Sequence, residues 1–181
     1  MIIPEYRDIS EVLSHVSPPP GGLWLEFGVA KGETLRELVD HAIRAPEPVE
    51  IFGFDSFLGL PEDWKPGYPK GTFGPGGMYW YGQPPNVPGA TLVHGWFADT
   101  LPNFNFSKPV TLVHIDCDLY SSTVTVLKHV GPHLIPGSLI LFDEFTESAA
   151  VGGKDEKSAL LESGLKFRYV CNSKVTVCIE S

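Results

Sequence analysis

The stretch LWLEFGVAKGETLRELVDHAI, residues Leu23–Ile43, decides the fold class. Its first five residues form an apolar run that is typical of a buried strand, and apolar side chains recur at helical spacing after Thr34. Thr34 and Glu37 match a capping box at the start of that helix. The glycine-bearing segment between them is a strand-to-helix turn, so this part of the chain predicts one strand followed by one helix of an α/β domain.

Working outward, the same alternation continues along the chain. Further strands are expected in EIFGF (50–54), TLVHGWF (91–97), VTLVHI (110–115), GSLILF (137–142), KFRYVCN (166–172) and KVTVCIES (174–181). Helices are expected over about 122–133 and from about 155. Alternating strands and helices predict a mostly parallel sheet with helices on both faces, and a turn at Asn172–Ser173 predicts a final antiparallel hairpin.

The chain is expected to form a single domain over residues 1–181, because 181 residues with 43% hydrophobic content suit one core. The breaker cluster SPPPGG separates an N-terminal segment, residues 1–22, from the body. Residues 56–90 are rich in glycine, proline and aromatic side chains, and include Trp80 and Tyr81. A loop of that length in a compact domain is usually functional, and we interpret it as a lid-like insertion.

Composition also excludes several partners. The net charge of −9 repels phosphate backbones, so we expect no nucleic acid partner. No apolar run is long enough to span a membrane, and the N-terminus does not read as a signal peptide, so a cytoplasmic protein is expected.

The three cysteines show no C-x-x-C pairing and are expected to be reduced core residues. The oligomeric state stays open, a homo-oligomer included.

Acidic residues stand where the predicted strands end. In open parallel sheets, ligands bind at the carboxyl ends of the strands, so these side chains should share one rim. They are Glu26, Asp55, Asp116, Asp118, Asp143 and Glu144.

The first turn argues for a nucleoside cofactor without phosphates. The dinucleotide fingerprint needs glycine at positions 28, 30 and 33, but the chain has Gly28, Ala30 and Glu33. Glu33 would repel a pyrophosphate at the helix N-terminus. Asp55 ends the second strand, where an acid can accept hydrogen bonds from ribose hydroxyls. S-adenosylmethionine, which has a ribose and a cationic sulfonium, suits a site surrounded by these strand-end carboxylates.

Six motifs occur along the chain in a fixed order. They are WLEFGVAKGETLREL, GFDSFLGLPEDW, KGTF, WFADTLP, HIDCDLYSST and FDEF. Together they resemble the macrocin O-methyltransferase family, bacterial enzymes that methylate sugar hydroxyls of antibiotics. The resemblance implies a Rossmann-like class I methyltransferase fold with a seven-stranded sheet. It also implies S-adenosylmethionine as cofactor. The implied cofactor-binding residues are Glu26, Phe27, Gly28, Gly32, Thr34, Asp55, Ser56, Trp96 and Asp116.

The second acidic group predicts a metal. If the fourth and fifth strands are neighbours, Asp116, Asp143 and Glu144 converge, and no lysine or arginine adjoins them in sequence. A hard divalent cation, Mg²⁺ first, would relieve their repulsion and lower the pKa of an acceptor hydroxyl. Asp116 and Asp118 are the candidate catalytic residues, with Asp118 the candidate general base; capping of the next helix is an alternative role for Asp118.

The leading hypothesis is a metal-assisted, S-adenosylmethionine-dependent O-methyltransferase that acts on a hydroxyl of a small-molecule acceptor, sugar-like or a natural product. Two other classes stay open. A metal-dependent hydrolase would use the acidic rim but would need neither Asp55 nor the glycine turn. A non-catalytic domain that binds S-adenosylmethionine or another nucleoside would bind the cofactor without methyl transfer.

Overall fold

A single mixed sheet organises the chain in the computed structural model, which describes residues 5, 8–79, 82–172 and 175–181. The strand order is β3-β2-β1-β4-β5-β7-β6, with β1 to β5 parallel and β7 antiparallel to both β5 and β6. The strands are β1 Leu23–Phe27, β2 Glu50–Asp55, β3 Thr91–His94, β4 Val110–Ile115, β5 Leu134–Phe142, β6 Phe167–Cys171 and β7 Thr176–Ile179. The predicted α/β class and the C-terminal hairpin are confirmed; Ser173 of its predicted turn lies outside the described residues.

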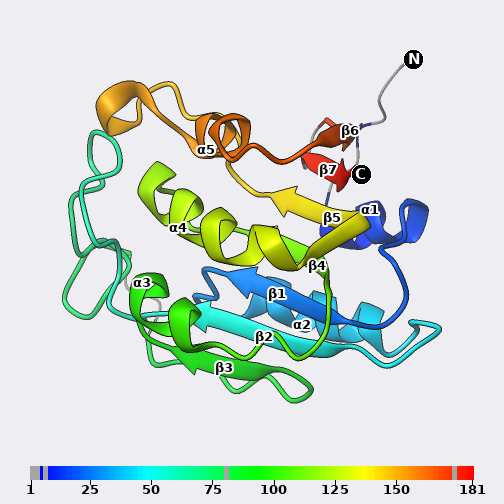
Figure 1. Cartoon of the computed structure of the whole chain (residues 1–181). Helices are drawn as coiled ribbons and strands as arrows, with labels where there is room; N and C mark the ends of the chain where they lie inside the picture. Colours follow the sequence, from blue (N-terminus) through cyan, green and yellow to red (C-terminus); the bar gives the residue numbers. More distant parts are fainter. Residues whose placement is uncertain (1–4, 6–7, 80–81, 173–174) are drawn as a thin grey trace.

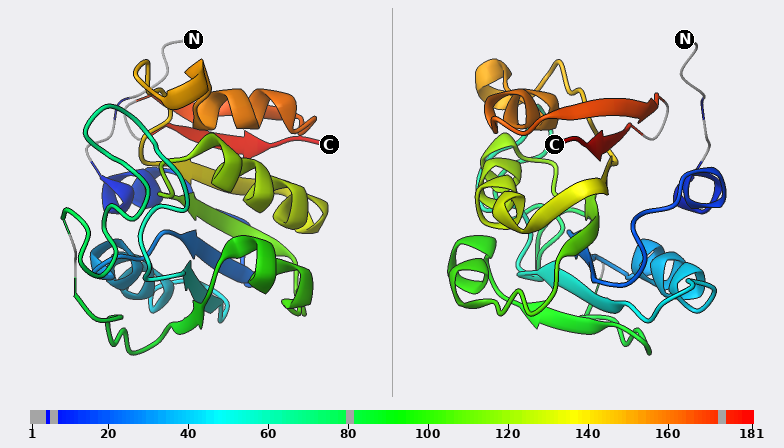
Figure 2. Two further views of the ribbon diagram at one scale, coloured as in Figure 1. Left: turned by 90° about the vertical axis from the view of Figure 1, so that its left-hand side faces the viewer. Right: turned by 45° about the vertical axis from the view of Figure 1, so that its right-hand side comes forward.

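Helices cover both faces of this sheet (Figures 1 and 2). One face carries α1 Ile9–His15 and α2 Glu33–Ala42, and the other carries α3 Phe97–Thr100, α4 Tyr120–Val130 and α5 Glu156–Glu162. Short 3-10 turns occur at Leu101–Asn103, Gly131–His133 and Val151–Gly153. In the described part of the chain, every helix is too short or too polar to cross a bilayer.

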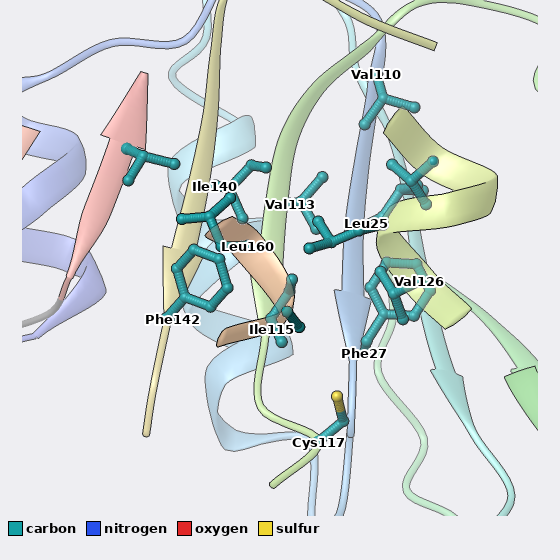
Figure 3. Packing of buried hydrophobic residues seen from close by; sticks show 14 of the residues in the cluster. Leu25, Phe27, Val110, Val113, Ile115, Cys117, Val126, Ile140, Phe142 and Leu160 are labelled. Carbon is teal, nitrogen blue, oxygen red and sulfur yellow. The ribbon is translucent and has the colours of Figure 1, made fainter. Parts of the chain in front are cut away.

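The central strands are apolar at nearly every position because both faces of the sheet are covered. All residues of β1 and β4 are buried. On the α4 and α5 side, Phe27, Ile115 and Phe142 pack with Val126 and Leu160 (Figure 3). The three cysteines are buried and free, as predicted. The sheet is therefore a rigid frame for the groups at its strand ends.

Two predicted boundaries were wrong for local reasons. The helix α2 is not capped by Thr34, because the helix begins one residue earlier at Glu33 and its N-cap is Gly32, whose φ of 74° is left-handed. The predicted third strand stops at His94, since Gly95 turns the chain and Phe97 already belongs to α3. In both places a glycine turn, at Gly32 after β1 and at Gly95 after β3, lies at the carboxyl end of a strand.

The insertion, residues 56–90, lies at this same end of the sheet (Figure 1, left). It is a compact loop: the Leu60 amide donates to Thr72 at 2.8 Å and the Phe73 amide donates to Met78 at 2.8 Å. Gly74 packs so closely that a β-carbon there would lie 2.1 Å from the Leu58 carbonyl oxygen. The described part of the insertion thus forms an ordered wall beside the strand ends.

Candidate active site

A cavity of about 1020 Å³ opens at the carboxyl ends of β1, β2, β4 and β5, and the insertion closes one side of it. Most of the residues that the sequence assigned to a site line this cavity. They are Gly28, Thr34, Asp55, Ser56, Trp96, Asp116, Asp118, Asp143 and Glu144. The volume suits a nucleoside cofactor together with an acceptor.

The remaining assigned residues, Glu26, Phe27 and Gly32, lie outside the cavity lining. Glu26 is 1% exposed within β1, and its Oε1 lies 3.0 Å from Nδ1 of His114. Burial, followed by the charges of Asp55 and Glu37, raises the pKa of Glu26 well above its usual range. His114 is itself buried in the core, at 1% exposed.

The turn after β1 is formed by backbone that only a small residue tolerates. Gly28 has a φ of 92°, and a β-carbon there would lie 1.8 Å from the Asp116 carbonyl oxygen. Ala30 has a φ of 47°, a left-handed conformation that is strained for alanine. Such strain concentrates at functional sites, and here the strained turn lines the cavity.

Asp55 binds this turn directly. Its Oδ2 accepts from the amides of Val29 at 2.9 Å and Ala30 at 3.0 Å, and its Oδ1 accepts from the amide of Phe57 at 2.7 Å. A carboxylate has about four acceptor positions, so Asp55 retains capacity on the side of Oδ1. Asp55 therefore both fixes the turn and lines the cavity.

Carboxylates gather on the opposite side, where β4 and β5 end side by side. The Asp116 amide donates to the Phe27 carbonyl at 2.9 Å, and the Asp143 amide donates to the Ile115 carbonyl at 3.0 Å. Pairing thus continues past the strand ends and brings the acids to adjacent positions. We call Asp116, Asp118, Asp143 and Glu144 the acidic rim.

Asp118 is the most unusual member of the acidic rim. Its φ of 66° is left-handed, which is uncommon for a residue with a β-carbon. Burial, then the charges of Asp116 and Glu144, raise its pKa to about 8. The helix α4 starts at Tyr120 after Leu119 and has no side-chain cap, so Asp118 does not act as its N-cap. The alternative capping role is wrong.

A lysine side chain lies beside the acidic rim, although it is far from these acids in the sequence. Lys65 of the insertion places its Nζ 3.6 Å from Oε2 of Glu144 and 2.7 Å from Oε2 of Glu147. No lysine or arginine adjoins these acids in sequence, but Lys65 compensates Glu144 from a distant part of the chain. Lys65 reaches Glu144 only through the folded insertion.

The predicted metal ligands do not fit a metal as they are arranged. Among the described residues, no group of three or more histidine, cysteine, aspartate or glutamate side chains is placed to hold an ion. Oxygen donors suit Mg²⁺, but Glu144 already faces Lys65. No chemical step is therefore assigned to a metal here.

The sequence analysis also missed a buried carboxyl group close to the rim. Glu156, the first residue of α5, is 0% exposed. Burial, then the charges of Asp116, Asp118 and Asp143, raise its pKa well above the usual range. Burial therefore favours the neutral form of this group. A lone glutamate after an aspartate N-cap reads as an ordinary first helical turn, so no sequence signal distinguished it.

Aromatic rings from the insertion form the outer wall of the cavity. Tyr68 stacks on Tyr79 with a centroid distance of 5.6 Å, and it contacts Trp64 edge-on at 5.2 Å. Phe73 completes this aromatic wall. Trp80 and Tyr81 lie outside the described residues.

A family model described as a methyltransferase domain matches residues 25–145, more than half of the chain. The chain belongs to this methyltransferase-domain family. The match runs from β1 to the residue after the acidic pair of β5, so the family region contains the glycine turn, Asp55 and the acidic rim.

Curated relatives match shorter pieces of the methyltransferase domain. A tetracenomycin 4'-O-methyltransferase of Streptomyces olivaceus, acting on the 8-demethyl-8-(2,3-dimethoxy-alpha-L-rhamnosyl) compound, is 36% identical over 55 residues, 30% of this chain and 21% of that protein. The mycinamicin III 3''-O-methyltransferase of Micromonospora griseorubida is 37% identical over 51 residues, 28% of this chain and 20% of that protein. The aligned region thus spans about a fifth of each relative.

Solved structures share the fold of the methyltransferase domain. The calicheamicin methyltransferase CalS11 gives a TM-score of 0.68 at 24% identity, covering 87% of this chain and 72% of that one. The O-methyltransferase NovP gives 0.60 at 19% identity, covering 95% and 76%. The mycinamycin-pathway methyltransferase MycE, described in complex with Mg and SAH, gives 0.56 at 14% identity, covering 88% and 44%.

Proposed function

We propose that the protein is an S-adenosylmethionine-dependent O-methyltransferase that acts on a hydroxyl of a small, sugar-like or natural-product acceptor. One observation carries this proposal: a single cavity joins the glycine turn and Asp55 at one end to the acidic rim at the other. A methyl donor and an acceptor bound in the same cavity satisfy the proximity that group transfer needs.

The cofactor end would be formed by the turn and the next two strand ends. Asp55 has remaining acceptor capacity for ribose hydroxyls, and Gly28, which lets the turn pack against the Asp116 backbone, lines the same wall. Trp96 offers a ring for the adenine. Thr34 and Ser56 add hydroxyl groups on the same wall, while Glu26, Phe27 and Gly32 do not line the cavity.

The acceptor end would supply the base. The acceptor oxygen attacks the methyl carbon, the carbon–sulfur bond breaks with its electrons returning to sulfur, and Asp118 takes the hydroxyl proton. The products are a methyl ether and S-adenosylhomocysteine. A base whose pKa is about 8 is well matched to an alcohol proton near neutral pH. Asp116 lies on the same wall, where its carboxylate would orient the sulfonium or the hydroxyl.

A divalent cation at Asp116, Asp143 and Glu144 remains part of the proposal without a step assigned to it. Its motive is the all-oxygen donor set; in the described structure these side chains are not gathered around one ion, so they would have to rearrange to hold it. A cation there would supply Lewis acidity to the acceptor hydroxyl. Stripping with EDTA, then assaying with and without MgCl₂, decides this: restored activity supports the metal, and full activity after stripping dismisses it.

The acceptor class is proposed from the relatives' names and the cavity wall. The two curated relatives are named for methylation of sugar-bearing antibiotics, and one CalS11 structure is described as a TDP-rhamnose 3'-O-methyltransferase. The aromatic wall would stack on a sugar or polyketide ring. A member of the macrocin O-methyltransferase group with a small-molecule acceptor fits these features, and the net charge of −9 disfavours a nucleic acid acceptor.

Two assays test the function. Calorimetry should give one site for S-adenosylhomocysteine and none for NAD. Transfer of a labelled methyl group from S-adenosylmethionine to a panel of rhamnosides and rhamnosylated polyketides should depend on Asp118. Binding without transfer to any acceptor would favour a non-catalytic domain, and hydrolysis of an ester or phosphoester without cofactor binding would favour the hydrolase class.

A further inference from the structure

The first part of the insertion is fastened to the elements that carry the acidic rim. Oγ of Ser121, in the first turn of α4, donates to Oε1 of Glu62 at 2.5 Å. The amide of Val151, in the loop after β5, donates to the carbonyl of Trp64 at 2.7 Å. Residues 62–65 thus form a short bridge between the aromatic wall and both sides of the rim.

Lys65 makes the charged contacts of this bridge. Its Nζ lies 2.7 Å from Glu147, 3.6 Å from Glu144 and 3.5 Å from the centroid of the Trp64 ring. The Lys65 side chain is 18% exposed, and Glu147 is 20% exposed. A partly buried pair is less screened by water and salt than a surface pair, so this contact holds the insertion more firmly than its length alone suggests.

Lys65 also faces the cavity, together with Tyr68 of the aromatic wall and Glu144 of the rim. An ammonium group there joins two surfaces that an acceptor would touch at the same time. We propose that Lys65 is a positioning residue for the acceptor: it fixes the aromatic wall to Glu144, so that a bound hydroxyl is presented to Asp118. The acceptor part of this inference rests on the proposed function, whereas the fastening of the insertion does not.

Hydrogen exchange of the free protein tests the fastening. In Lys65→Met, amides of residues 60–74 should exchange about tenfold faster, because the bridge loses its charge and opens locally more often. Lys65→Arg should restore protection, since it keeps the charge. The matched control is Lys108→Met, whose ammonium pairs with Glu50 at 2.8 Å at the opposite end of the strands, where β2 and β4 begin. It should leave exchange in 60–74 unchanged.

Kinetics test the positioning. With an acceptor that gives turnover, Lys65→Met should raise the acceptor KM by about tenfold or more and change the affinity for S-adenosylhomocysteine by less than about twofold. Glu147→Gln, which removes the closer carboxylate of the pair, should act in the same direction and serves if Lys65→Met does not fold. The proposal is overturned if amides 60–74 of Lys65→Met exchange at the wild-type rate, or if Lys65→Arg does not restore their protection. It is also overturned if Lys65→Met leaves the acceptor KM unchanged.

If no acceptor is turned over by the wild type, the proposed function fails while the exchange comparison still decides whether Lys65 fastens the insertion. The two failures are therefore distinguishable. Faster exchange in Lys65→Met with protection restored by Lys65→Arg supports the fastening on its own.

Discussion

Replacing Asp55 should weaken the fold and the cofactor site together. Asp55→Ala removes the acceptor of three backbone hydrogen bonds, from Val29, Ala30 and Phe57, at 2.9, 3.0 and 2.7 Å. A hydrogen bond to a charged group contributes about 1.5–3 kcal/mol. Water can reach the freed amides through the cavity and replaces part of this, so we expect a loss of about 2–4 kcal/mol in the free energy of unfolding.

Asp55→Asn separates the two roles of the residue. The amide keeps one oxygen acceptor and the shape of the side chain but loses the charge, so the unfolding free energy should fall by about half as much. Affinity for S-adenosylhomocysteine should fall by about tenfold or more in both variants, since the ribose partner is altered in both.

The assay combines urea unfolding, followed by circular dichroism, with calorimetry of S-adenosylhomocysteine under conditions where each variant is folded. Asp40→Ala is the control, because Asp40 is exposed on α2 and does not line the cavity. If Asp55→Ala unfolds at the same urea concentration as the wild type, the structural reasoning is refuted. Unchanged affinity in both variants would refute the cofactor assignment.

Three further predictions concern single positions. Asp118→Asn should lower kcat by about 10²–10⁴-fold with cofactor affinity retained; calorimetry with turnover checks this, and near-normal kcat would exclude Asp118 as the base. Ala30→Gly should relieve the left-handed backbone and raise the unfolding free energy by up to about 1 kcal/mol in urea melts; destabilisation would contradict the strain. Glu156 has a raised folded-state pKa, so its contribution is fully present below the unfolded pKa of about 4.3 and is lost as pH rises. Glu156→Gln should therefore gain stability over wild type between pH 5 and pH 8, by at most about 1.4 kcal/mol per pH unit; a constant difference across that range would count against a buried neutral acid.

The fold was predictable because its signals are local. Each strand of the sheet is an apolar run bounded by turns, and burial on both faces leaves β1 and β4 with no polar alternation that could confuse their assignment. Helix starts were less accessible to prediction. Thr34 satisfies the capping pattern, but the left-handed Gly32 begins α2 one residue earlier.

The candidate site was predictable where strand ends define it. Asp55 ends β2, and Asp116 and Asp143 directly follow β4 and β5, so parallel topology alone brings them to one cavity. Lys65 could not be placed, since its contact with Glu144 depends on how a long irregular insertion folds back. The expectation that a metal relieves the repulsion among these acids was formed without that contact.

The left-handed conformation of Ala30 was equally hidden. An alanine in a glycine turn gives no sign from sequence that its φ is positive. The neutral state of Glu156 also depends on three acids from other elements, Asp116, Asp118 and Asp143, that only the fold brings near it.

A crystal structure of the protein grown with S-adenosylhomocysteine tests the central claim most directly. We predict that the ligand occupies the cavity between the glycine turn and the acidic rim, with its ribose hydroxyls on Asp55 and its sulfur facing Asp118. A ligand bound elsewhere, or one whose sulfur points away from Asp118, would contradict the proposed methyl transfer.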